Sequence, residues 1–353
     1  MTREGGTGDG VCALRRPPLT CLRVFETCVI RGRRFAPARF CAPLAGYTHS
    51  AFRRLLAAWG GHGALWTEML AARQVRSENF ATSPWLRRRP AEGFVFYQLM
   101  ARQGDPLDRI LDHLGAQGVE GLDLNLACNA RTARACAAGS ALFDNLPALR
   151  VVVADARRHW PGILTAKIRL GHERPNWTAP FTERLQLLTD EGVDAIILHP
   201  RFFEEKFKRR ARLELLPWVA SLTRLPLVAN GDITGPEHVA AHAADLQPAA
   251  AIMLGRMAVA RPWVFAQWDR PARVDLAGVW QTLHDFVAED FPPAVALRRL
   301  QMFTRYFAAN FKFGHQFHVA IKNAVSLAEA RARADDFFAG SPAVVSQPAI
   351  GLI

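Results

Sequence analysis

The thiol of Cys128 is the side chain in this sequence best placed to do chemistry. It follows the short apolar run Gly121 to Leu126, at the start of a segment predicted to be a loop. A free thiol has a pKa of about 8.5, so it is mostly protonated near neutrality and can act as a general acid. A thiolate nucleophile would need an adjacent His or Lys to lower its pKa, and the local sequence offers only Arg131 and Arg134. We therefore expect Cys128 to donate a proton.

The other cysteines do not indicate a metal centre or a disulfide framework. None of them forms a close Cys-x2-Cys pair, and six cysteines are few for a chain of 353 residues. They are Cys12, Cys21, Cys28, Cys41 and Cys136. His315 and His318 have neither a nearby cysteine nor the glutamate of a zinc-protease motif. We expect no metal, and reduced thiols in a cytoplasm.

Polar or conformationally special residues end nearly every one of eight apolar runs. Any single glutamine or histidine after a strand is most often an ordinary loop group, but the series as a whole is not expected by chance. In chain order the ends are Ala42-Pro43, Glu68-Met69, Gln98, Asn125 with Cys128, Lys167 with Arg169, His199 with Arg201, Asn230-Gly231-Asp232, and Gly255-Arg256. We infer that these residues converge on one site.

The elements that must position them are strands alternating with helices. The apolar runs are Phe40–Leu44, Ala64–Thr67, Phe94–Leu99, Gly121–Leu126, Ile163–Arg169, Ala195–Leu198, Leu225–Ala229 and Ala251–Leu254. Amphipathic stretches between them predict helices at Pro106–Gly115, Leu146–His159, Thr182–Glu191, Glu214–Leu222 and Pro236–Ala244. This alternation predicts an α/β fold, a (β/α)8 TIM barrel. An open doubly wound sheet would be expected to show a glycine-rich turn after its first strand, and Ala42 to Gly46 is not one.

The last two strand ends indicate a phosphate-bearing ligand. Barrel enzymes commonly bind phosphate after their seventh and eighth strands, through backbone N–H groups and a helix N-terminus. Gly255 allows close approach of the backbone, and Arg256 offers a bidentate clamp. Lys167 could hold a positive charge near an electron-rich ring, and with Gln98 and His199 placed around the same ring the set suits flavin mononucleotide (FMN).

Composition favours a polyanionic or phosphate-bearing partner. The chain has a formal net charge of +12 and a pI near 10.2, and half of its residues are hydrophobic, enough for a large core. No apolar run approaches the roughly 20 residues that cross a bilayer, so we expect a soluble protein with no membrane partner. Residues 1–37 are rich in Gly and Arg and are expected to form a basic, disordered extension.

An ordered set of motifs resembles the tRNA-dihydrouridine synthases. Together they run from about residue 40 to 268. They are Ala42-Pro43-Leu44-Ala45-Gly46-Tyr47-Thr48, Trp66-Thr67-Glu68-Met69, Gln98-Leu99, Asp123-Leu124-Asn125-Leu126-Ala127-Cys128, Gly139-Ser140-Ala141-Leu142, Lys167-Ile168-Arg169-Leu170-Gly171, Leu198-His199-Pro200-Arg201, Ala229-Asn230-Gly231-Asp232-Ile233 and Gly255-Arg256. Each motif alone is weak, because related FMN barrels share several. The ordered set with a loop cysteine after the fourth strand is specific.

The resemblance implies a role for each matching residue. Its FMN contacts fall on Ala42, Pro43, Gln98, Lys167, His199, Asn230, Asp232, Gly255 and Arg256. Its uracil contacts fall on Asn125 and Arg169, and we add Arg201 to the substrate-binding set. It also implies that NADPH reduces the flavin, that hydride passes from flavin N5 to uracil C6, and that Cys128 protonates C5. Cys136 matches no family cysteine and is interpreted as a bystander.

The loop departs from the family pattern Asn-x-Gly-Cys-Pro-x-Lys. Ala127, Asn129 and Arg131 stand where that pattern has Gly, Pro and Lys, and His49 stands where the family tends to have Asp. Alanine narrows the backbone choices, and asparagine removes a fixed φ. We therefore expect a divergent member whose loop closes in its own way.

The sequence changes character after residue 270, which gives a barrel over 38–270 and a helical domain over 271–353. Segments such as Leu297 to Phe307 interleave Arg with Phe and Tyr, which suits binding to tRNA. The segment Phe202 to Arg212 is a denser basic loop on the expected active-site face. Two other functions stay open: a catalytically inactive RNA-binding barrel, and an FMN oxidoreductase acting on a small molecule. We expect a monomer.

Overall fold

A computed structural model describes residues 25–205, 209–268, 270–271 and 273–352. Its main feature is a sheet of eight parallel strands in the order β3-β10-β9-β8-β7-β6-β5-β4. The strands are β3 (Arg39–Cys41), β4 (Leu65–Ala71), β5 (Val95–Met100), β6 (Gly121–Asn125), β7 (Ile163–Arg169), β8 (Ala195–His199), β9 (Leu227–Asn230) and β10 (Ala251–Leu254). A parallel bridge between Phe40 and Ala64 joins the two outer strands, so the sheet is a nearly closed barrel. The predicted TIM barrel is confirmed, and each apolar run overlaps one strand.

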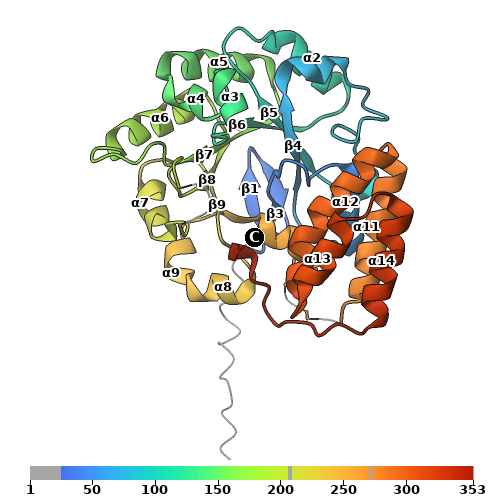
Figure 1. Ribbon diagram of the computed structural model, residues 1–353. Helices are drawn as coiled ribbons and strands as arrows, with labels where there is room; N and C mark the ends of the chain where they lie inside the picture. The colour runs from blue at the N-terminus through green and yellow to red at the C-terminus, as the bar shows by residue number, and fades with distance from the viewer. Residues whose placement is uncertain (1–24, 206–208, 269, 272, 353) are drawn as a thin grey trace, which may run out of the picture.

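Helices surround the barrel (Figure 1). They are α1 (Ser50–Trp59), α2 (Leu107–Ala116), α3 (Arg131–Ala135), α4 (Ser140–Asp144), α5 (Leu146–His159), α6 (Thr178–Asp190), α7 (Leu216–Ser221), α8 (Pro236–Ala241), α9 (Ala243–Leu246) and α10 (Arg256–Ala260), with the short 3-10 helices η2 (Ala72–Ser77), η3 (Pro90–Glu92) and η4 (Leu213–Leu215). Helix α5 has the predicted limits because the side chain of Asn145 caps it, accepting from the Ala148 N–H at 3.2 Å. The helix predicted over Pro236–Ala244 is instead two short helices that meet at His242.

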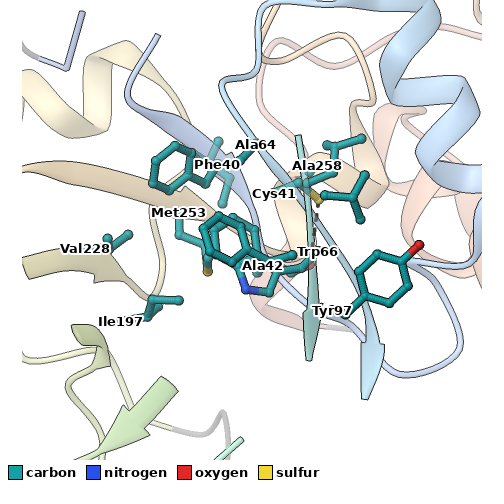
Figure 2. Packing of buried hydrophobic residues seen from close by; sticks show 14 of the residues in the cluster. Phe40, Cys41, Ala42, Ala64, Trp66, Tyr97, Ile197, Val228, Met253 and Ala258 are labelled. Atoms are coloured by element: carbon teal, nitrogen blue, oxygen red, sulfur yellow. Dashed lines mark hydrogen bonds between the residues drawn. The ribbon is translucent and has the colours of Figure 1, made fainter. Parts of the chain in front are cut away.

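The barrel interior is filled by apolar side chains from several strands. Figure 2 shows Phe40, Trp66, Ile197, Val228 and Met253 pointing toward one another. The rings of Trp66 and Phe96 stack at a centroid distance of 4.2 Å. Dense packing at this level leaves no room for a ligand, so polar chemistry is confined to the strand ends.

A two-stranded hairpin covers the amino-terminal end of the barrel. It pairs β1 (Cys28–Ile30) with β2 (Arg33–Phe35) around a turn in which Arg31 and Gly32 both have positive φ, as a tight hairpin requires. The ring of Phe35 packs edge-on against Phe40 and Phe94. We expected disorder up to residue 37, and for this segment that expectation is wrong: the buried Phe35 anchors it to the barrel. Residues 1–24 lie outside the described residues.

Four helices follow the barrel and pack beside it. They are α11 (Leu276–Asp290), α12 (Pro293–Phe307), α13 (Gly314–Lys322) and α14 (Leu327–Ala339), with the 3-10 helices η5 (Ala308–Asn310) and η6 (Ile350–Leu352). Asp290 joins this bundle to the barrel. Its carboxylate accepts a hydrogen bond from the Ser50 hydroxyl and forms ion pairs with Arg87 at 3.2 Å and Arg89 at 2.9 Å. None of the helices described is long and apolar enough to cross a membrane.

Candidate active site

A cavity of about 530 Å³ opens at the carboxyl ends of the barrel strands. Every residue to which we assigned a catalytic, cofactor-binding or substrate-binding role lines it. These residues are Ala42, Pro43, Gln98, Asn125, Cys128, Lys167, Arg169, His199, Arg201, Asn230, Asp232, Gly255 and Arg256. The eight parallel strands therefore do bring the predicted residues together.

Buried polar groups on β5, β6 and β7 form a continuous hydrogen-bonded chain, here called the amide wall: Thr165, Asp123, Gln98 and Asn125. The hydroxyl of Thr165 donates to Asp123 Oδ1 at 2.7 Å, and Gln98 Nε2 donates to Asp123 Oδ2 at 2.6 Å. Asn125 Nδ2 then donates to Gln98 Oε1 at 2.8 Å. Each of these side chains is at most 5% exposed. Buried groups paired in this way are fixed in direction as well as in place.

The amide wall ends on the loop that carries Cys128. Asn125 Oδ1 accepts from the backbone N–H groups of Ala127 at 3.1 Å and Cys128 at 2.9 Å. On the other side, the Ser140 N–H donates to the Cys128 carbonyl at 2.9 Å. A side chain at Gly139, where φ is +60°, would bring its Cβ within 2.5 Å of that carbonyl oxygen. The thiol is therefore presented by a loop that is held at both ends.

Asn129 contributes its own anchors to this loop. Its Nδ2 donates to the Phe203 carbonyl at 3.2 Å, and its Oδ1 accepts from the Ser140 hydroxyl at 2.9 Å. Ala127 is not among the described residues that have positive φ, so it adopts its position without strain. Hydrogen bonds thus immobilise the loop where the family pattern has proline.

Cys128 differs from the other described cysteines in its surroundings. Cys28 and Cys41 are buried in apolar packing, which raises the pKa of each thiol to about 12. Cys136 is exposed at the end of α3 and does not line the cavity. Cys128 lines the cavity and is within electrostatic range of Lys167 and Arg169. Both cations come from β7, so the local sequence around Cys128 could not reveal them.

The wall formed by β8, β9 and β10 is charged; it consists of His199, Arg201, Asp232 and Arg256 and is called the charged wall. Asp232 accepts from Arg201 Nη2 at 2.6 Å and from Arg256 Nη2 at 2.8 Å. Burial acts to raise the pKa of Asp232, but the hydrogen bonds and charges of these arginines outweigh it and lower the pKa. The carboxylate is therefore engaged in holding two arginines at the cavity.

His199 is neutral in this environment. Burial, followed by the charges of Lys167 and Arg169, holds its pKa well below the ordinary value. Arg201 Nη1 lies 2.7 Å from His199 Nε2, and because a guanidinium can only donate, Nε2 must be the acceptor. The ring proton is therefore on Nδ1. Gly231, where φ is +120°, is required beside it, since a Cβ there would lie 2.8 Å from the imidazole.

Lys167 and Arg169 are both buried cations. Burial, reinforced by Arg169, lowers the pKa of Lys167 to about 8, although Asp123 acts in the opposite direction. Burial, reinforced by Arg201, lowers the pKa of Arg169 to about 10. Both remain charged at neutral pH, so the middle of the cavity is electropositive.

Two groups at the cavity were not anticipated from the sequence. Tyr47 and Tyr306 pack edge-to-face with centroids 5.5 Å apart, and both line the cavity together with Ile350. Tyr306 belongs to α12, so the helical bundle contributes directly to the site. The only available signal was the aromatic content of that helix, which does not indicate where the helix docks.

The basic segment Phe202 to Arg212 is partly neutralised. Arg212 pairs with Glu205 at 2.6 Å, and Arg209 pairs with Glu173 at 2.9 Å. Residues 206–208, which include two of its lysines, lie outside the part of the chain that the structure describes. These ion pairs hold the described parts of the segment, residues 202–205 and 209–212, beside the cavity.

Comparison with known proteins identifies the family. The model of the dihydrouridine synthase (Dus) family matches residues 40–328. The tRNA-dihydrouridine synthase B of Shewanella oneidensis is 28% identical over 226 residues, covering 64% of this chain and 69% of that protein. The probable tRNA-dihydrouridine synthase of Rhizobium leguminosarum bv. phaseoli is 28% identical over 277 residues, covering 76% and 84%. That of Rhodobacter capsulatus is 30% identical over 237 residues, covering 66% and 71%.

Solved structures with the same fold are more distant in sequence. Histamine dehydrogenase from Rhizobium sp. 4-9 superposes with a TM-score of 0.56 at 14% identity, over 80% of this chain and 51% of that one. The old yellow enzyme from Trypanosoma cruzi gives 0.52 at 10% identity, over 72% and 94%. At such identities these likenesses establish the barrel alone. The family match extends over most of the chain and includes every residue assigned to the cavity, and on that basis the protein belongs to the dihydrouridine synthase family of oxidoreductases.

Proposed function

We propose that this protein reduces uridine to 5,6-dihydrouridine in tRNA, using bound FMN and NADPH. One observation carries the proposal. The chain belongs to the dihydrouridine synthase family, and every residue assigned to flavin binding, uracil binding or proton donation lines one cavity at the carboxyl ends of the barrel strands. The relatives named above are themselves called tRNA-dihydrouridine synthases.

The cavity fits a flavin in size and in chemistry. Its volume of about 530 Å³ is within the range of roughly 300 to 1,000 Å³ typical of cofactor sites. Arg256 and Gly255 would hold the phosphate, with Asp232 acting through the arginines that it orients. Gln98, Lys167 and His199 would surround the ring, and Ala42 and Pro43 would lie against it. When bound, FMN accepts electrons from NADPH and supplies the hydride that adds to C6 of the uracil.

Side chains of the protein would bind the uracil and supply the proton. Asn125 and Arg169 would bind the polar edge of the uracil, and Arg201, which also lines the cavity, would complete the substrate-binding set. Cys128 would donate its proton to C5 as the C5–C6 double bond becomes single, leaving a thiolate. Lys167 and Arg169 would stabilise that thiolate until solvent returns the proton.

The helical bundle, α11 to α14, is proposed to bind the tRNA. Tyr306 brings it into the cavity wall, so tRNA bound to the bundle would lie beside the site that receives its uridine. A uridine must leave its stack to reach a recessed site, and aromatic groups at the entrance can stack on neighbouring bases. The net charge of +12 favours such a partner over a small molecule.

The purified protein provides the test. We expect flavin absorbance, its bleaching by NADPH, and its recovery on addition of tRNA that lacks dihydrouridine, with dihydrouridine then detected by mass spectrometry. Recovery with a small enone but not with tRNA would instead identify a small-molecule oxidoreductase. A protein that binds tRNA but retains no flavin would be an inactive RNA-binding barrel. Either result would reject the proposal.

A further inference from the structure

We propose that Asp123 is a positioning residue: its carboxylate sets the direction of the Gln98 and Asn125 amides and, through them, holds the loop that carries Cys128. This role depends on hydrogen bonds within the protein itself. It rests on the proposed function only in giving the placement of the thiol a purpose. Asp123 neither lines the cavity nor figures among the residues assigned to cofactor or substrate.

The direction in which the hydrogen bonds of the amide wall run follows from the chemistry of Asp123. Burial, partly offset by its hydrogen bonds with Thr165 and Gln98, raises the pKa of Asp123 to about 6, so it is ionised at neutral pH. An ionised carboxylate can only accept hydrogen bonds. Gln98 must therefore present its Nε2 to Asp123 and turn its Oε1 toward Asn125. The carboxylate thereby removes the twofold ambiguity that an amide side chain otherwise has.

The same constraint passes to the loop. Because Gln98 offers an oxygen, Asn125 must offer its Nδ2 in return, which leaves Asn125 Oδ1 facing the N–H groups of Ala127 and Cys128. If the chain were reversed, Asn125 would present an NH₂ group to those two donors, and neither would have an acceptor. Only one of the two directions holds the loop.

Solvent has little access to these hydrogen bonds. Asp123 and Gln98 are 0% exposed, and Asn125 is 5% exposed. A side-chain amide turned the wrong way round would therefore lack a hydrogen-bond partner. An ionised carboxylate in such a place is itself costly for folding. Lys167 is the charged group that acts favourably on Asp123, from the neighbouring strand β7. A group retained at a net cost to stability is a candidate for a functional role.

The first test replaces the carboxylate by an amide of the same shape. Asp123→Asn can present either its oxygen or its NH₂ group to Gln98, so both directions of the chain become possible. Hydrogen exchange at Ala127 and Cys128, followed by mass spectrometry, is expected to accelerate about tenfold, as for the loss of one net hydrogen bond. Alkylation of Cys128 should change relative to that of Cys136, which is exposed and outside the chain.

A double variant separates a relay from general loosening. In Asn125→Asp, the residue at 125 accepts from both loop N–H groups whatever Gln98 does. Adding Asp123→Asn to that variant should leave exchange at the loop unchanged, whereas the two effects would simply add if Asp123 acted through packing. Thr189→Val is the matched control, because Thr189 is a buried hydroxyl on α6 that bonds to Leu185 and Thr223, away from this chain. It should destabilise the fold without changing exchange at the loop.

Gln98→Met provides a second route if Asp123→Asn does not fold. It removes the amide that links Asp123 to Asn125 and keeps Asp123 itself. We expect the same acceleration of hydrogen exchange at Ala127 and Cys128. Wild-type protection at Ala127 and Cys128 in either folded variant would overturn the proposal. Exchange and alkylation are measured without tRNA or reductant. A failure here therefore leaves the proposed reaction standing, and a protein that forms no dihydrouridine can still confirm this relay.

Discussion

The amide wall, which reaches the cavity through Gln98 and Asn125, and the charged wall border one cavity but pair their polar groups differently. In the amide wall, one carboxylate and two amides form a chain in which each bond fixes the next. In the charged wall, one carboxylate joins two arginines beside a neutral imidazole, which leaves excess positive charge. A chain of directional bonds can place an atom, whereas a charge excess can attract an anion. This difference supports our proposal that the amide wall positions the chemistry and that the charged wall binds the cofactor phosphate.

The largest expected effect concerns the thiol at the end of the amide wall. Cys128→Ala removes the proposed proton donor, and we expect dihydrouridine formation in tRNA to fall by a factor of roughly 10² to 10⁴. Flavin reduction by NADPH should be unchanged, because that step does not use the thiol. Cys136→Ala is the control and should retain full activity. If the two variants exchange these results, the amide wall does not position the chemistry.

The charged wall predicts a binding defect of intermediate size. Arg256→Ala should weaken FMN by about 10-fold to 100-fold, as for loss of a charge-assisted hydrogen bond to phosphate. Quenching of flavin fluorescence measures the affinity. Riboflavin lacks the phosphate, so its affinity should not change. Arg209→Ala removes a cation that pairs with Glu173 outside the cavity and should affect neither ligand. Equal weakening of FMN and riboflavin would contradict a phosphate-binding wall.

Lys167 lies between the two walls, and its ionisation should make FMN binding depend on pH. Because its folded pKa is lowered to about 8, its charge is lost as pH rises through 8, well before that of an ordinary lysine. Binding of FMN should therefore weaken by up to about tenfold between pH 7 and pH 9. Lys167→Met should bind weakly at both values. A wild-type affinity that is flat across this interval would show that Lys167 does not face the flavin.

The remaining prediction concerns the folding free energy that the buried carboxylate of the amide wall costs. The folded pKa of Asp123 is raised from 3.8 to about 6, so the native state holds its proton more tightly than the unfolded chain does. Its destabilising contribution is absent below pH 4, grows as pH rises, and is complete above about pH 6. Asp123→Asn should therefore raise the free energy of unfolding at pH 8 by roughly 1 to 3 kcal/mol. Urea unfolding at pH 5 and pH 8 measures it, and a difference that does not grow with pH would contradict it.

Sequence patterns were sufficient to predict the barrel and to identify the residues at the ends of its strands. Parallel strands bring their ends together whatever the details of the loops, so Gln98, Lys167 and Arg256 could be placed on one face from order alone. The contribution of Tyr306 could not, because it depends on how α12 docks against a loop some 260 residues earlier in the chain. The hairpin at residues 28–35 was missed because three-residue strands carry too short a pattern.

Asp123 was missed for a different reason. It lies within a motif that was recognised, but its alternation with Leu122 and Leu124 is that of any inward-facing strand residue. Nothing in one sequence tells which buried acceptor faces Gln98. That knowledge comes from the register of β5 on β6, which sets Gln98 beside Asp123.

The side-chain anchors of Asn129 constrain how this loop can evolve. Its amide contacts Phe203 and Ser140, which lie on two other segments of the chain. A change of Asn129 to the proline of the family pattern would remove both contacts at once, and neither partner could replace them alone. Proline is therefore not a neutral substitution at this position. A loop in which a pair of side-chain contacts takes the place of a rigid ring can accept that ring only if other sites change with it.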